Sequence, residues 1–175
     1  MRPPLTTTRP ARLAAAVLAL GLGVTGAACK HGRGSAEKAL LELRPVLASN
    51  PPPCAAKAPK SGQLVLLKTS EGQPGECLQL DKPLVDATDV RSATVAETPA
   101  REPALSVVLG AVGSANLDGY AQRNQGKRLA IVTRGRLVSA PVLQFTSFAG
   151  RIQVTGLSKA DTDDLFGRLN KLIKA

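Results

Sequence analysis

Aromatic residues and histidine are scarce in this chain of 175 residues. It has no tryptophan, one tyrosine and three phenylalanines, so aromatic residues make up 2% of the sequence. Because single-stranded nucleic acids are bound by stacking bases on aromatic side chains, this scarcity argues against nucleic-acid binding despite a net charge of +10. The one histidine, His31, lies in a segment that reads as a linker, where it cannot be held against a nucleophile. We therefore expect no enzyme of the Ser-His-Asp or Cys-His type.

Motifs for metals, phosphates and acid–base catalysis are also lacking. Asp86 and Asp89 do not have the ligand spacing of a calcium loop, and turn or cap hydrogen bonds are the expected role. The run Gly110 to Gly113 lacks both phosphate-loop patterns and predicts a turn leading into a helix. Carboxylates at the start of the last expected helix fit its dipole: Asp161, Asp163 and Asp164. We expect no catalytic residue, cofactor or metal.

The one long apolar run lies near the N-terminus. It covers Leu13–Val24, which is shorter than the about 20 residues of a membrane-spanning helix. Arginines precede it and small residues follow it, which is the layout of a secretory signal. We therefore expect residues 1–28 to be a signal peptide and the protein to be exported.

Cys29 directly follows this signal and decides between a lipid anchor and free release. Small residues before a cysteine resemble a lipobox, although Gly26 stands where leucine is usual, and the same residues would suit ordinary signal peptidase. The chain has three cysteines, and assigning Cys29 to lipid leaves an even pair. We expect a diacylated lipoprotein on the extracytoplasmic side of the membrane, because two acyl chains anchor stably.

Cys54 and Cys77 are the remaining pair. In an oxidising compartment they would close a loop that stabilises the fold by roughly 3 kcal/mol. A metal pair is the alternative, but no histidine or third cysteine lies nearby to complete a zinc site. We expect a disulfide.

Residues 29–60 read as a lipid-anchored, proline-rich tether. Ser35–Pro45 predicts a short helix, and Pro51–Pro53 enforces an extended segment. The folded domain is then expected over residues 61–175.

Apolar periodicity within this domain predicts an α+β fold. We expect a small antiparallel or mixed sheet with two helices packed on one face, preceded by short disulfide-linked strands. Strands are expected at Leu64–Lys68, Cys77–Leu80, Pro83–Val95 after a loop, Ala104–Leu109, Lys127–Val132, Arg136–Ala140 and Arg151–Thr155. Helices are expected at Ser114–Arg123 and after Ser158, which is predicted to cap the last helix.

The block from Gly126 to Pro141 carries a family resemblance. It reads Gly-Lys-Arg-Leu-Ala-Ile-Val-Thr-Arg-Gly-Arg-Leu-Val-Ser-Ala-Pro, and closely resembles the pattern Gly-Lys-x-Leu-Ala-Ile-Val-Leu-Asp-Gly-x-Val-x-Ser-Ala-Pro of the SecD and SecDF subunits of bacterial protein export. Weaker similarity to the head of their first large extracytoplasmic domain extends from Leu78 to the C-terminus. The resemblance implies an extracytoplasmic head module that contacts exported polypeptide or other export subunits. The family's membrane-spanning part has no counterpart after this head, so we expect an accessory binding module without proton-driven transport of its own.

A basic stretch departs from the family pattern. From Gly119 to Ala160 there are seven lysines and arginines and no acidic residue, and the turn carries arginines where the family has Asp-Gly. Exposed residues of the hairpin and its turn are the candidate partner contacts: Arg128, Arg134, Gly135, Arg136 and Arg151. A solvated polar face is the plainer interpretation. An alternative function is the binding of anionic lipid or envelope polymers.

Overall fold

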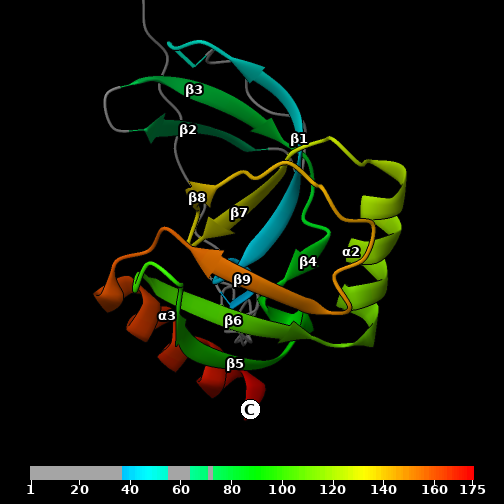
Figure 1. Cartoon of the computed structure of the whole chain (residues 1–175), viewed down its shortest axis with the longest axis vertical. Coiled ribbons are helices and arrows are strands. Elements are labelled where there is room, and N and C mark those ends of the chain that lie inside the picture. The colour runs from blue at the N-terminus through cyan, green and yellow to red at the C-terminus, as the bar shows by residue number, and fades with distance from the viewer. Residues whose placement is uncertain (1–36, 55–63, 71–72) are drawn as a thin grey trace, which may run out of the picture.

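The computed structural model describes residues 37–54, 64–70 and 73–175. These residues form two antiparallel sheets and two helices, which confirms the α+β class (Figure 1). The first sheet has the order β2 (Leu64–Ser70), β3 (Gln73–Leu80), β1 (Glu42–Asn50), β7 (Leu129–Thr133), β8 (Arg136–Ser139), with β4 (Val85–Asp86) beside β1. The second has the order β5 (Val90–Glu97), β6 (Pro103–Leu109), β9 (Arg151–Thr155).

Strand β1 corrects the expected tether. The predicted helix at Ser35–Pro45 and the domain start at 61 are wrong, because Leu41 and Leu43 are buried and β1 pairs with both β7 and β3. Pro45 lacks an N–H and lies where the pairing passes from β7 to β3. The rest of the expected tether, 29–36 and 55–60, lies outside the described residues.

An ion pair accounts for the two charges inside β1. Arg44 Nε lies 2.8 Å from Glu42 Oε2, and both side chains are 9% exposed. Arg44 Nη1 also donates to the backbone oxygen of Asp81 at 2.9 Å. A buried pair is tolerated when its remaining hydrogen bonds are satisfied.

The β7–β8 hairpin is confirmed. Its turn residues Arg134 and Gly135 both have positive φ, 49° and 75°, as the favoured two-residue hairpin turn requires. Strand β7 is buried over its whole length. Leu129 and Ile131 join the main core, whereas Ala130 and Val132 pack with β3 in a second, smaller core. Both faces of β7 are therefore covered.

The two helices follow strands of the second sheet in the chain, one after its central strand β6 and one after its outer strand β9. α3 (Lys159–Ile173) packs on β5 and β6 through Leu165 and Leu169. Ser158 caps it by accepting a hydrogen bond from the backbone N–H of Asp161, as predicted. α2 (Ala111–Arg123) begins three residues before the expected start. Within the described part of the chain, no helix is both long and apolar enough to cross a bilayer.

Gly113 marks a close contact between α2 and the 3-10 turn Ala87–Asp89. Asp86 and Asp89 form a reciprocal capping box around that turn, which confirms their expected role. A Cβ on Gly113 would lie 2.7 Å from the Cβ of Asp89. Gly113 therefore allows α2 to pack closely against this turn.

Two alanine substitutions in α2 are expected to change the free energy of unfolding in opposite directions. Gly113→Ala forces Asp89 to move, and this overpacking should cost about 1–3 kcal/mol of stability. The cost should outweigh the gain from the higher helix propensity of alanine, so the variant should be less stable. Gly119→Ala meets only the end of Arg123, at 3.7 Å, and should stabilise by up to about 1 kcal/mol. Urea unfolding of both variants checks this. Equal stabilisation by both would contradict the close contact.

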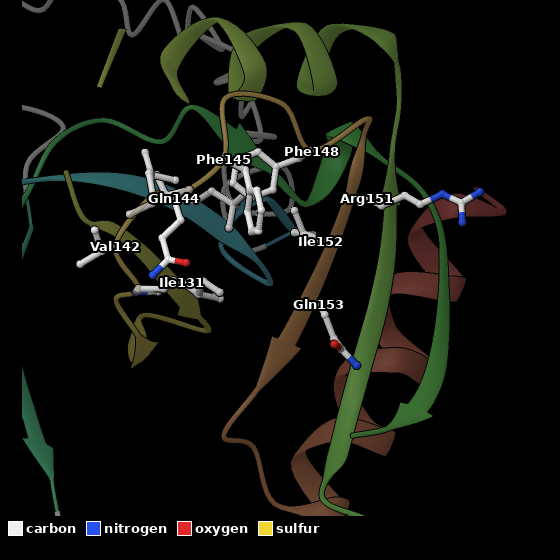
Figure 2. A pocket seen from close by; sticks show the side chains of 12 residues that line it. Ile131, Val142, Gln144, Phe145, Phe148, Arg151, Ile152 and Gln153 are labelled. Atoms are coloured by element: carbon white, nitrogen blue, oxygen red, sulfur yellow. The ribbon is translucent and has the colours of Figure 1, made fainter. Parts of the chain in front are cut away.

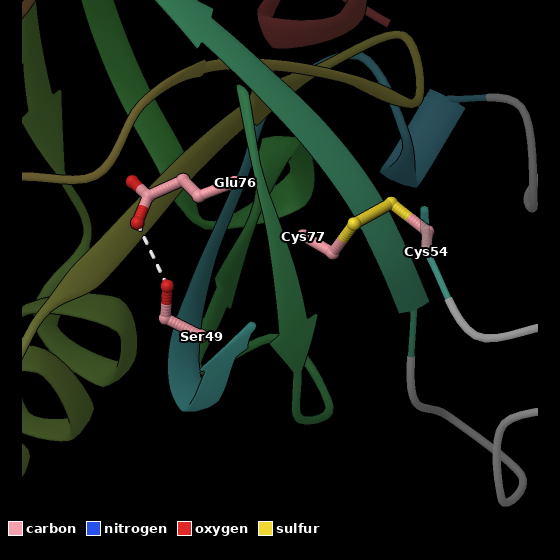
Figure 3. Close-up of a disulfide and its surroundings, with 4 residues drawn as sticks. All are labelled: Ser49, Cys54, Glu76 and Cys77. Carbon is pink, nitrogen blue, oxygen red and sulfur yellow. Dashed lines mark hydrogen bonds between the residues drawn. A yellow bond between two sulfur atoms is a disulfide. The ribbon is translucent and has the colours of Figure 1, made fainter. Parts of the chain in front are cut away.

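The disulfide Cys54–Cys77 is present, with its Cα atoms 5.3 Å apart (Figure 3). It joins the residues just after β1 to β3, two strands that already pair at Asn50 and Cys77. Beside it, Ser49 Oγ donates to Glu76 Oε2 at 2.7 Å. The bond thus links the C-terminal end of β1 covalently to β3.

Candidate functional site

An open cleft of about 610 Å³ lies between the first sheet and β9 (Figure 2). Strands β1 and β7 supply one wall, β9 the other, and the segment 141–148 runs along it. Its lining is mostly apolar: Leu43, Leu129, Ile131, Pro141, Val142, Leu143, Gln144, Phe145, Phe148, Arg151, Ile152 and Gln153.

Two large apolar side chains of the cleft are exposed to solvent. Phe145 is 67% exposed and Val142 is 50% exposed. In Figure 2 the rings of Phe145 and Phe148 lie close together above Ile152. Exposed apolar patches in clefts mark binding surfaces. The chain has few aromatic residues, and two of its three phenylalanines are here.

Segment 141–148 is pinned to its surroundings at both ends. Leu143 is buried and exchanges backbone hydrogen bonds with Gly126 and Lys127 at 2.9 and 2.8 Å. At the other end, Phe148 N–H donates to Asp118 of α2 at 2.7 Å. The cleft is thus formed in the free protein, which reduces the entropy cost of binding.

The charge of the cleft is small. None of its twelve lining residues is acidic, and Arg151 is the single charged one. Figure 2 shows the Arg151 side chain directed away from the two phenylalanines. The cleft therefore suits an uncharged, apolar occupant.

Two of the predicted contact residues are held in ion pairs elsewhere. The Arg128 guanidinium donates two hydrogen bonds, of 2.9 and 2.6 Å, to the Glu76 carboxylate. These bonds raise the pKa of Arg128 above its ordinary value. Arg134 bridges Asp161 and Asp164 of α3 at 2.8 and 2.9 Å. Acidic partners from distant parts of the chain thus offset charges that look unopposed in the sequence.

The other predicted contacts are dispersed. Gly135 and Arg136 are exposed at the hairpin turn, and Arg151 is exposed at the start of β9. Of all five predicted residues, Arg151 alone lines the cleft. The structure does not gather them into one site.

The Asp161 carboxylate should report on the Arg134 contact. The hydrogen bond from Ser158, and secondarily that from Arg134, holds the Asp161 pKa below its ordinary value of 3.8. Because the Asp161 pKa is lower in the folded state, its carboxylate stabilises the fold at pH values above the unfolded-state pKa. This stabilisation is lost as the pH falls through the folded-state pKa. We expect the Asp161 pKa to rise toward 3.8 in Ser158→Ala and, to a smaller extent, in Arg134→Ala, as measured by carboxyl NMR titration. An unchanged pKa in both variants would contradict these contacts.

Comparison with known proteins identifies the family. The family model described as SecDF, P1 head subdomain, matches residues 63–171. SecD of Acetobacter pasteurianus is 31% identical over 118 residues, covering 67% of this chain and 21% of that protein. SecDF of Thermus thermophilus is 30% identical over 82 residues, covering 47% of this chain and 11% of that protein. The chain belongs to the SecDF P1 head subdomain family, and it spans about a fifth or less of these curated relatives.

Solved structures agree on the fold. A structure of the membrane component SecDF, described as enhancing protein export, superposes with a TM-score of 0.54 at 20% identity, covering 80% of this chain and 64% of that one. SecDF in its super-membrane-facing form gives the same TM-score and identity, with 80% and 19% covered. The residues of this chain that the structure describes therefore share their fold with the head of SecDF.

Proposed function

We propose that this protein binds exposed apolar stretches of unfolded polypeptide during export, as a non-enzymatic accessory module of the cell envelope. The observation that carries the proposal is the preformed apolar cleft with Phe145 and Val142 exposed at its mouth. Family membership supports the link to export, because the relatives are named as protein translocase subunits.

The chemistry of the cleft favours binding over catalysis. Its lining contains no carboxylate, histidine or cysteine that could act as acid, base or nucleophile. Its size falls in the range of ordinary ligand sites, about 300–1,000 Å³, and fits a few apolar side chains of an extended segment.

Removing the exposed ring of Phe145 should weaken this binding without unfolding the protein. We expect Phe145→Ser to weaken the affinity for an apolar, unstructured peptide about tenfold or more, because burial of such a side chain contributes about 1.5–3 kcal/mol. Val112→Ser, at an exposed apolar position of α2 that does not line the cleft, is the matched control. Fluorescence anisotropy measures both. Equal affinities of the two variants would reject the cleft as the site.

We also propose that Cys29 is acylated and holds the domain on the extracytoplasmic face of the membrane. The fold begins by Leu41, so the segment between anchor and domain is shorter than the sequence predicted. At about 3.3–3.6 Å per residue, it spans at most roughly 40 Å. Intact mass of the mature protein is expected to include the lipid, and Cys29→Ser should release the protein from membranes. A mature chain that carries no lipid would contradict the anchor.

Anionic lipid or polymer binding is the alternative function. It would use Arg136, Arg151 and the turn at Gly135, since Arg128 and Arg134 already have acidic partners. Such binding should be lost in Arg136→Glu with Arg151→Glu and should weaken steeply with salt. Binding that is indifferent to both would exclude it.

A further inference from the structure

The free edge of β9 adds a second feature to the cleft. β9 is the outermost strand of the second sheet and pairs with β6. Leu109 N–H donates to Gly150 O at 2.8 Å, and hydrogen-bonded positions alternate along antiparallel strands. The register then directs the backbone groups of Ile152 toward β6 and those of Gln153 and Thr155 away from it.

These outward groups are open to a partner. The outward N–H of Arg151 donates to Phe148 O at 2.9 Å. Within the part of the chain that the structure describes, the outward backbone groups of Gln153 and Thr155 have no such backbone bond. The edge contains no proline, and its pairing with β6 has no register shift. Native edges are usually protected by such features, so this edge remains able to pair.

The edge borders the cleft with its main chain. Arg151, Ile152 and Gln153 all line the cleft. Figure 2 shows the side chains of Arg151 and Gln153 directed away from Phe145 and Phe148, on the far side of the β9 ribbon. Arg151 and Gln153 therefore line the cleft with their backbone atoms.

We propose that a bound polypeptide segment of about five residues adds to β9 as a further antiparallel or parallel strand. It hydrogen-bonds to the backbone of Gln153 and Thr155, and alternate side chains enter the apolar cleft beside Phe145 and Phe148. The inference rests on the proposed function and specifies its binding mode. Main-chain bonds are independent of side-chain identity, which suits a module that must accept many exported sequences.

The cleft also selects the occupant. The wall formed by Leu43, Leu129 and Ile131 lies across the cleft from β9 and offers apolar contacts to the side chains of an added strand. Because the lining is mostly apolar and the Arg151 side chain is directed away from it, a segment with uncharged, apolar side chains is favoured.

The test uses the full chain and a blocked nine-residue peptide that alternates valine and serine. Gln153→Pro deletes the outward backbone N–H of this residue. The dissociation constant of the peptide should rise about tenfold, because the peptide's carbonyl that would accept from this N–H is left unpaired. Gln153→Ala keeps the backbone and should bind like the original chain. Circular dichroism checks that Gln153→Pro is folded.

Amide hydrogen exchange of the original chain provides a readout that needs no variant. On adding the peptide, exchange at Gln153 and Thr155 should slow at least about tenfold, whereas Arg151, already bonded to Phe148, should change little. If Phe145→Ser abolishes binding but neither Gln153→Pro nor the exchange responds, the strand-addition mode is overturned and the proposed function stands. If the peptide does not bind at all, both fall. Protection accompanied by dimerisation in sedimentation would instead assign the edge to a second copy and overturn the inference.

Discussion

Leu41→Ala is expected to lower the free energy of unfolding by about 2–5 kcal/mol. The Leu41 side chain is fully buried in the main core just before β1, and truncation there leaves a cavity in addition to the lost transfer free energy. Leu47→Ala, within β1 but at a side chain that is 49% exposed, is the control and should change stability by less than about 0.5 kcal/mol. Chemical denaturation measures both. If both substitutions lowered stability only slightly, residues 41–50 would belong to the tether that the sequence predicted and not to the folded core.

Loss of the Cys54–Cys77 disulfide should cost about 3 kcal/mol, since it frees a loop with a sequence separation of 23 residues in the unfolded chain. We expect reductant to lower the stability of the original chain by this amount. The double variant Cys54→Ser, Cys77→Ser should have the lower stability from the start and be insensitive to reductant. If reductant lowers the stability of the double variant as well, the effect does not come from this bond.

The elements that the sequence predicted well are those with local signals. α3 has an N-cap serine and an apolar face at helical spacing, and the β7–β8 hairpin has an Arg-Gly turn between two apolar runs. The disulfide followed from cysteine parity. Each of these signals is complete within a few residues or a simple count, so no knowledge of tertiary contacts was needed.

Strand β1 was missed because its stabilising contacts are distant in sequence. Leu43 pairs with Ile131 in β7, and Glu42 is tolerated in the interior because Arg44 neutralises it. Helix-forming residues and Pro45 therefore read as a helix and its end, whereas burial between two strands decides the outcome. The division of strands into two sheets was missed for the same reason.

The acidic partners of the basic stretch and the apolar cleft were not predicted. Arg128 and Arg134 find their acids on β3 and α3, which a window of sequence between Gly119 and Ala160 cannot show. The cleft brings together β1, β7, β9 and one connecting segment. A usable signal was the pair Phe145 and Phe148 in a segment with no strand periodicity, in a chain with few aromatic residues.

Site-specific photocrosslinking in export-active cells tests the central claim most directly. A photoreactive side chain at Phe145 is expected to crosslink to newly exported polypeptides, and the adducts should disappear when export is blocked. The same group at Val112, also exposed but outside the cleft, should give few adducts. Equal crosslinking at both positions, or none at Phe145 while export proceeds, would contradict a role of the cleft in holding exported chains.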